Sequence, residues 1–472
     1  MKPIFLCGRW LTTHQQREVR HPYDGHVVEV VAQATPQDVT RAIDGLQAGA
    51  ADLRRRSAAE RAAWLQRAAQ QLRDQSEAFA QIITLEEGKT LAEARTEVAR
   101  AAETLALSAE EGCRLTGEMV PLEGSSAGAG KLGFTLRVPC GIVAAITPFN
   151  FPLNLVCHKV GPALAGGNAV LIKPASATPL TALRLVELLL NSGVPEAALA
   201  CLPGPGEELG RAICGDPRIR KISFTGSHAV GEQICHQAGL KRITMELGGN
   251  APVIVLDDAD VEQAAAAIVR GGFSNAGQVC ISAQRILAVR RVADDLRDAL
   301  QPHIAQLKAG DPRDPSVQMG PMIAPREAER VAVWIEEAVQ AGGRVVAGGG
   351  HHGALHQPTL LDHLSPHTRF FQEELFGPAV GIMHCQSVDE AFAWANASRY
   401  GLAASLFTRD LERAAQFLHT VDAGNLHING TTQWRADLMP YGGLKASGFG
   451  KEGPRYALRE MTEEKLVVWH MP

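Results

Sequence analysis

The sequence has nine cysteines in 472 residues but no pair in the CxxC pattern. Such pairs are typical of many zinc and redox sites, so scattered cysteines predict free thiols in a reducing compartment, and we expect a cytoplasmic protein. The sequence also lacks any run of about 20 uninterrupted apolar residues. Its first residues show no apolar stretch with a small-residue cleavage site. We therefore expect neither a membrane-spanning segment nor secretion.

An excess of positive charge is also missing, since the formal net charge is −5 at pH 7. We interpret the only arginine run, residues 54–56, as a solvated helix face, and no nucleic-acid partner is expected. Aromatic residues make up only 5%, but 46% hydrophobic and 21% charged residues are ordinary for a globular protein. A chain of this length predicts two or three packed units.

The first third of the sequence has a helical pattern. Thr35 and Ser57 each stand three residues before an acidic residue, as in a capping box at the start of a helix. Gly88 and Gly112 suit the ends of long alanine-rich helices.

From residue 141 onward, short apolar runs alternate with amphipathic stretches, which predicts a parallel sheet covered by helices on both faces. Ligands bind such sheets beyond the carboxyl ends of the strands. A second set of runs predicts a second α/β domain that packs against the first around a shared cleft. The first set lies at 141–147, 169–174, 198–204 and 221–227, and the second at 285–291, 377–385, 402–410 and 424–430.

Seven motifs resemble the aldehyde dehydrogenase superfamily and occur in that family's order. They are TPFNFPL at 147–153, KPAS at 173–176, FTGS at 224–227, ELGGN at 246–250, NAGQVC at 275–280, EELFGPA at 373–379 and PYGGLKASGFGKEG at 440–453. The resemblance extends nearly end to end. Within that family, the sequence is similar to the branch that acts on lactaldehyde, on glyceraldehyde 3-phosphate without phosphorylation, or on succinate semialdehyde.

The resemblance implies an α/β fold of the aldehyde dehydrogenase type that assembles as a homodimer or homotetramer. A Rossmann-type cofactor-binding domain would comprise residues 1–118 and 137–246, and an α/β catalytic domain residues 247–440. Residues 119–136 and 441–472 would form an oligomerisation arm and a C-terminal segment.

Three catalytic residues follow from the same motifs. Cys280 would attack the aldehyde, because a tetrahedral hemithioacetal releases hydride far more readily than a flat carbonyl does. Glu246 would act as the base for hydrolysis of the resulting thioester. The side chain of Asn150 and the backbone N–H of Cys280 would hold the oxyanion.

The resemblance also implies a site for NAD or NADP. Ser176 stands where NAD-preferring relatives often carry glutamate, and a neutral hydroxyl makes NADP admissible. The glycine loop at 204–210 is one residue longer than the usual dinucleotide fingerprint and is weak evidence alone. The predicted cofactor-binding residues are Ile146, Thr147, Pro148, Phe149, Lys173, Ser176, Gly206, Gly210, Phe224, Thr225, Gly226, Ser227, Leu247, Gly248, Glu374 and Phe376.

Two arginines are candidates for binding the substrate. Arg100 and Arg435 would select a short aldehyde with a polar or anionic far end. The alternative for Arg100 is an exposed helix residue paired with Glu97 or Glu103. Val279 replaces an arginine found in phosphate-specific relatives, which favours lactaldehyde, glycolaldehyde or succinic semialdehyde over a phosphorylated aldehyde.

Two other functions stay open at this point. A coenzyme-A-acylating dehydrogenase would release the thioester to a thiol, although such relatives often lack the base at Glu246. A binding protein that has lost activity would keep the fold without turnover.

No metal site is predicted. The acidic run 257–260 suits a helix cap better than a cation site. Histidines with ligand-like spacing are interrupted by Gly353 and Pro358 and have no cysteine nearby. They are His351, His352, His356, His363 and His367.

Overall fold

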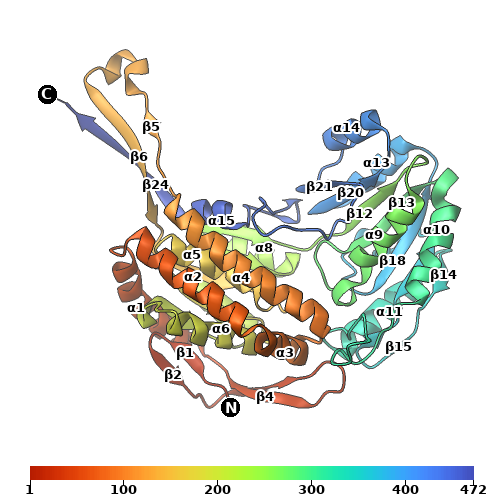
Figure 1. Cartoon of the computed structure of the whole chain (residues 1–472), viewed down its shortest axis with the longest axis horizontal. Helices are drawn as coiled ribbons and strands as arrows, with labels where there is room; N and C mark the ends of the chain where they lie inside the picture. Colours follow the sequence, from red (N-terminus) through yellow and green to blue (C-terminus); the bar gives the residue numbers. More distant parts are fainter. Residues whose placement is uncertain (472) are drawn as a thin grey trace.

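The computed structural model describes residues 1–471 and shows two α/β halves and a projecting arm (Figure 1). The first half contains an eight-stranded sheet in the order β2-β1-β9-β8-β7-β10-β11-β23, in which β7 to β11 are mutually parallel. Its strands are β1 (Ile4–Leu6), β2 (Arg9–Leu11), β7 (Ile142–Ile146), β8 (Ala169–Lys173), β9 (Leu199–Cys201), β10 (Ile219–Thr225), β11 (Arg242–Glu246) and β23 (Gly448–Phe449).

Helices cover both faces of this sheet, so its central strands are apolar on both sides. Val143 and Ala145 of β7 pack into the core under α2 to α6, whereas Ile142, Ala144 and Ile146 pack against α1, α7 and α8. The helices are α1 (Pro36–Leu53), α2 (Ala58–Asp74), α3 (Ser76–Glu87), α4 (Leu91–Cys113), α5 (Asn154–Ala165), α6 (Leu180–Asn191), α7 (Gly206–Gly215), α8 (His228–Ala238) and α15 (Pro454–Glu460).

The second half is built on a seven-stranded sheet in the order β14-β17-β18-β13-β12-β20-β21, parallel except for β14. Its strands are β12 (Ala251–Val255), β13 (Ala283–Val289), β14 (Arg344–Ala347), β17 (Thr359–Asp362), β18 (Ala379–Cys385), β20 (Ala403–Phe407) and β21 (Asn425–Ile428). The helices around it are α9 (Val261–Phe273), α10 (Arg290–Ala305), α11 (Pro325–Gln340), α12 (Arg369–Gln372), α13 (Val388–Asn396) and α14 (Leu411–Thr420).

The arm is a three-stranded antiparallel sheet that projects from the first half and ends near the C-terminus (Figure 1). It consists of β5 (Met119–Val120), β6 (Lys131–Pro139) and β24 (Thr462–His470), and β24 pairs with β6 along its whole length. The remaining strands form small hairpins or pairs: β3 (Gln16–Arg20) with β4 (Val27–Ala32), β15 (His351–His352) with β16 (Leu355–His356), and β19 (Tyr400–Gly401) with β22 (Leu444–Lys445).

Each of the eight strand runs predicted from the sequence overlaps a strand of the structure. Thr35 and Ser57 form the predicted capping boxes, and Gly88 ends α3 with φ +90°. The helix end predicted near Gly112 is confirmed to within one residue, since α4 ends at Cys113, but Gly112 itself is still helical and Arg114 is the C-cap. Gly112 instead lets α4 approach α5, since a Cβ there would lie 3.0 Å from the Cβ of Ala165.

The domain boundaries stay a prediction, and the structure adds one detail to them. Within the C-terminal segment 441–472, β23 pairs with β11 and α15 packs on α4 and α5, so residues 441–461 belong to the body of the molecule. None of the helices in residues 1–471 has the length and apolar character needed to cross a membrane.

Candidate active site

A cavity of about 770 Å³ lies at the carboxyl ends of β7, β10 and β11 and reaches the second half of the molecule. The strand order changes direction between β7 and β10, and such a switch point is where doubly wound sheets bind ligands. All predicted cofactor-binding residues line this cavity except Ser176, whose hydroxyl donates a hydrogen bond to the carbonyl of Gly204. Asn150, Glu246 and Cys280 line it as well.

The surface of this cavity fits a dinucleotide. Gly206 and Gly210 have open space where a Cβ would stand, so a ligand can approach the backbone of α7 closely. Lys173 is buried, and burial together with the charge of Arg17 lowers the pKa of its ammonium to about 8. Glu374 accepts a hydrogen bond from the N–H of Gly249 at 3.0 Å, and burial raises its pKa to about 7.

Cys280 follows a left-handed turn. Asn275, Ala276 and Gly277 have φ values of +50°, +52° and +69°. A Cβ on Gly277 would lie 2.1 Å from the carbonyl oxygen of Gly377, so glycine is required there. Burial raises the pKa of the Cys280 thiol to about 12, although a hydrogen bond with Tyr441 acts in the opposite direction and lowers it.

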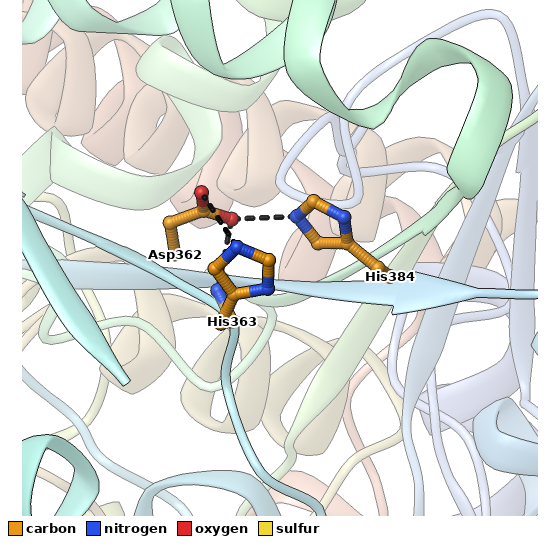
Figure 2. Close-up of side chains that lie close together, drawn as sticks. All are labelled: Asp362, His363 and His384. Atoms are coloured by element: carbon orange, nitrogen blue, oxygen red, sulfur yellow. Dashed lines mark hydrogen bonds and ion pairs between the residues drawn. The ribbon is translucent and has the colours of Figure 1, made fainter. Parts of the chain in front are cut away.

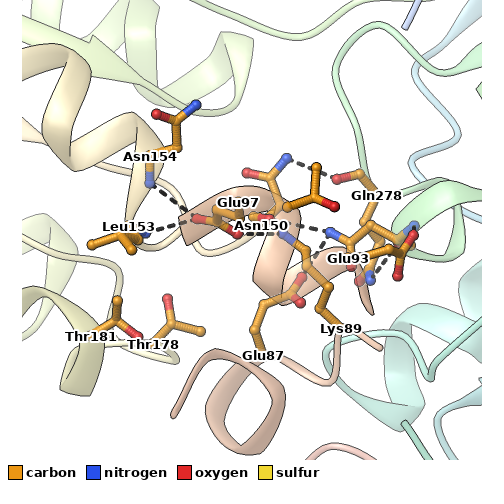
Figure 3. A network of polar contacts seen from close by, with 12 residues as sticks. Glu87, Lys89, Glu93, Glu97, Asn150, Leu153, Asn154, Thr178, Thr181 and Gln278 are labelled. Atoms are coloured by element: carbon orange, nitrogen blue, oxygen red, sulfur yellow. Dashed lines mark hydrogen bonds and ion pairs between the residues drawn. The ribbon is translucent and has the colours of Figure 1, made fainter. Parts of the chain in front are cut away.

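Buried polar contacts hold this turn and Asn150 together (Figure 3). Lys89 Nζ lies 2.6 Å from a carboxylate oxygen of Glu97 and donates to the backbone carbonyl of Asn150 at 2.8 Å. The Asn150 side-chain amide donates to the carbonyl of Gln278 at 2.8 Å. Asn275 donates to Glu87 at 2.8 Å. The predicted oxyanion donor and the loop before the nucleophile therefore belong to one rigid network.

Glu246 ends β11 and is 3% exposed. Within residues 1–471 neither of its carboxyl oxygens has a hydrogen-bond partner. Burial, followed by the negative charge of Glu452, raises its pKa well above the ordinary value. Glu452 itself is ionised, because Lys159 lies 2.6 Å away and lowers its pKa to about 2 despite burial. Glu246 thus holds a proton more readily than an ordinary carboxyl and lies near an ion pair.

A second cavity, of about 320 Å³, is lined by Cys280 together with Arg100 and Arg435. Arg100 donates two hydrogen bonds to Asp437, at 2.8 and 3.0 Å. The pairing considered from the sequence is therefore wrong: Glu97 is buried with Lys89, and the partner of Arg100 comes from a distant loop.

Arg435 lies over the ring of Tyr441, with its guanidinium carbon 3.8 Å from the ring centroid. It is ion-paired with Glu452 at 3.2 Å, and its Nε has no partner among the described residues. Asp437 and Glu452 stand behind the two arginines and do not line the cavity. The two guanidinium groups line the cavity beside the Cys280 sulfur, together with the ion pair of Lys89 and Glu97 and with Glu93.

Among residues 1–471, Asp362, His363 and His384 are the trio whose ligand atoms lie close enough to hold a metal ion (Figure 2). The Asp362 carboxylate accepts from His384 Nε2 at 2.7 Å and lies 3.5 Å from Arg297. Although burial opposes it, the hydrogen bond from His384 lowers the pKa of Asp362 to about 2. Arg297 already balances the negative charge of Asp362, so these contacts need no metal ion to account for them. The absence of a metal stays a prediction. Asp260 caps α9, as the sequence predicted.

The sequence model of the aldehyde dehydrogenase family matches residues 10–467. The chain belongs to the aldehyde dehydrogenase family. The 3-sulfolactaldehyde dehydrogenase of Priestia aryabhattai is 43% identical over 470 residues, which cover 99% of this chain and 98% of that protein. The lactaldehyde dehydrogenase of Methanococcus vannielii is 35% identical over 471 residues, covering 99% and 100%.

A solved structure of the NADP-dependent glyceraldehyde-3-phosphate dehydrogenase of Bacillus halodurans, complexed with NADP, superimposes with a TM-score of 0.98 at 34% identity. The match covers 100% of this chain and 99% of that one. The predicted fold is confirmed. The chain is an aldehyde dehydrogenase, an enzyme that oxidises a small aldehyde to the acid with NAD or NADP.

Sequence reasoning missed several residues of the site. Tyr441 stands inside a quoted motif, yet nothing in the motif shows that its hydroxyl reaches the sulfur. Lys159 and Glu452 are brought together from segments 293 residues apart. Arg17, on β3, is the additional cation near Lys173.

Proposed function

We propose that this aldehyde dehydrogenase oxidises a three-carbon 2-hydroxyaldehyde with an anionic group on the far carbon. The observation that carries the proposal is the smaller cavity, which presents Arg100 and Arg435 beside Cys280. Its volume of about 320 Å³ suits a small substrate. Guanidinium groups bind sulfonate, carboxylate and phosphate through paired hydrogen bonds, which favours a charged end.

The named relatives support this chemistry. Sulfolactaldehyde, lactaldehyde and glyceraldehyde 3-phosphate are all three-carbon aldehydes with a hydroxyl next to the carbonyl, and two of them carry an anion on the third carbon. Val279, in place of an arginine, favours a sulfonate over a phosphate. Sulfolactaldehyde is therefore the first candidate, which replaces the uncharged hydroxyaldehydes and succinic semialdehyde favoured by the sequence alone.

The residue roles that we propose follow the sequence prediction. The Cys280 thiolate adds to the aldehyde carbon, and the oxygen of the resulting hemithioacetal accepts hydrogen bonds from Asn150 and the N–H of Cys280. Nicotinamide, when bound, accepts the hydride. Glu246 then removes a proton from the water that hydrolyses the Cys280 thioester, and the acid is released.

The cofactor residues, the assembly and the location complete the proposal. Lys173, near Arg17, would bind the adenosine ribose, Gly226 and Ser227 the pyrophosphate, and Glu374 with Phe376 the nicotinamide riboside. We propose that NAD and NADP both serve, because Ser176 introduces no negative charge. The protein would act in the cytoplasm as a homo-oligomer.

The test is reduced-cofactor formation with 3-sulfolactaldehyde, lactaldehyde, glyceraldehyde 3-phosphate, succinic semialdehyde and hexanal, using NAD and NADP without coenzyme A. Arg100→Met should lower kcat/KM for sulfolactaldehyde about 10- to 100-fold, since it removes a hydrogen bond to a charged group. The value for lactaldehyde should change much less. Arg95→Met, on the exposed side of the same helix, is the matched control.

Two results would overturn the proposed substrate class. One is a preference for hexanal over every polar aldehyde. The other is an equal loss for sulfolactaldehyde and lactaldehyde in Arg100→Met. Acid formation without coenzyme A also separates hydrolysis from acyl transfer.

A further inference from the structure

The reacting sulfur has a specific neighbour. Cys280 Sγ lies 3.2 Å from the hydroxyl oxygen of Tyr441. Within residues 1–471, neither atom makes another hydrogen bond. We propose that Tyr441 is a further catalytic group, whose hydroxyl donates a hydrogen bond to the Cys280 thiolate, stabilises that charged form and fixes the direction of attack. The inference rests on the proposed role of Cys280 as nucleophile.

Tyr441 is held too firmly for this contact to be incidental. Its side chain is 3% exposed and packs with Val279 and Ile281 on either side of the nucleophile. Its backbone exchanges two hydrogen bonds with Glu452, at 2.7 and 3.2 Å. A phenylalanine would supply the same packing, whereas a buried hydroxyl is costly unless it is hydrogen-bonded. The role of the Tyr441 hydroxyl is therefore its contact with the Cys280 sulfur.

The charges around the pair favour the donor role of Tyr441. The guanidinium of Arg435 lies over the phenol ring, and a positive charge there makes the hydroxyl a stronger donor. A thiol is a weak donor but a thiolate is a strong, charged acceptor, so the contact is much stronger when Tyr441 donates to the anion.

Among the groups facing Cys280, Tyr441 is the one that stabilises the thiolate through a hydrogen bond, and Arg435 adds only the effect of its charge. Burial and the charges of Glu374 and Glu246 all raise the pKa of the thiol, whereas Tyr441 and Arg435 lower it. One hydrogen of the Asn150 side-chain amide goes to the Gln278 carbonyl, and the hydrogen bond to the Cys280 sulfur comes from Tyr441. Only the thiolate is an effective nucleophile, so a donor beside the sulfur is required.

The experiment measures alkylation of Cys280 by iodoacetamide as a function of pH in the NADP-bound enzyme, with the Cys280 peptide quantified by mass spectrometry. In Tyr441→Phe the midpoint of the profile should rise by about one pH unit or more, and the rate near pH 7 should fall at least about tenfold. Tyr400→Phe is the matched control, because Tyr400 is also buried and stacked on an arginine but bonds to Arg399 and Glu373. Its midpoint should equal that of wild type.

An unchanged or lower midpoint in folded, NADP-binding Tyr441→Phe overturns the inference. If that variant does not fold, replacement of all four tyrosines by 3-fluorotyrosine provides the second measurement. The fluorinated phenol is more acidic and donates more strongly, so the midpoint should fall, and a midpoint that stays in place contradicts the inference. Failure of the proposed function would look different: Cys280→Ala would keep its dehydrogenase activity, whatever the alkylation profiles show.

Discussion

Burial shifts three acidic groups of the active-site cavities towards their protonated forms: the Cys280 thiol, the Glu246 carboxyl and the Glu374 carboxyl. Glu246 can accept a proton from water only in its ionised form, which its raised pKa disfavours. The nearby ion pair of Lys159 and Glu452 provides polar groups next to the buried Glu246 carboxyl. The raised pKa values thus oppose the thiolate and carboxylate forms that the proposed reaction needs, so Cys280 and Glu246 must lose protons before they can act.

Replacing Glu246 with Gln should separate the two halves of the proposed reaction. The thiol is unchanged, so a first burst of reduced cofactor should form at nearly the normal rate. Hydrolysis of the thioester should slow by about 100-fold or more, since a positioned base contributes roughly that much. Rapid-mixing absorbance of NADPH measures both phases. Loss of the burst together with the steady rate would assign Glu246 to an earlier step, and no change in either would place the base elsewhere.

At the scale of elements, the left-handed turn before Cys280 depends on the helices α3 and α4 of the other half. Glu87, at the end of α3, accepts from the Asn275 side chain, and Glu93 of α4 accepts from its backbone N–H at 2.7 Å. All three residues of the turn have positive φ, which is unfavourable for the two that are not glycine, Asn275 and Ala276. The contacts with Glu87 and Glu93 are therefore needed to hold the turn. The geometry of Cys280, the proposed nucleophile, thus reflects contacts made across the interface between the two halves.

Stability should depend on pH through Glu87. Burial raises its pKa from an ordinary value near 4.5 to about 8. Between these values the folded protein holds a proton that the unfolded chain releases, so stability falls as pH rises through this window and levels off above it. In Glu87→Gln this fall should be smaller by up to about 3 kcal/mol between about pH 6 and 9. Denaturant titrations at both pH values, with the exposed Glu103→Gln as control, measure it. Parallel falls in wild type and Glu87→Gln would contradict the buried, protonated state.

The strands could be predicted, and the three residues proposed as catalytic do line one cavity, because their signals are local. Cys280, Glu246 and Asn150 each stand in a short motif, and apolar runs mark the buried strands. The partner of Arg100 could not be predicted, since Asp437 lies 337 residues away and meets it only when the two halves pack. The contact between Tyr441 and Cys280, 161 residues apart, arises in the same way. What the sequence leaves open is the set of polar contacts made between segments distant along the chain.

At the scale of the whole molecule, exposed apolar side chains on the arm support the proposed homo-oligomer. Met119, Leu466 and Trp469 are 67%, 57% and 63% exposed, and Leu136 also faces solvent. Apolar residues grouped on a projecting sheet are typical of an interface between subunits. The strand β24 also covers the edge of β6, which would otherwise be open to unspecific pairing.

Deletion of residues 465–472 should therefore abolish the native assembly. Most of β24 is lost, β6 becomes an open edge, and the apolar side chains of Leu466 and Trp469 no longer contribute to the interface. Size-exclusion chromatography with light scattering should show smaller species or aggregates in place of the wild-type oligomer. Trp469→Glu tests the same surface without removing the strand and should weaken assembly, whereas Leu411→Glu, which changes an even more exposed apolar residue on α14, should not. A truncated protein that remains a stable oligomer of native size would show that the subunits meet elsewhere, and the arm would then need another partner for its exposed side chains.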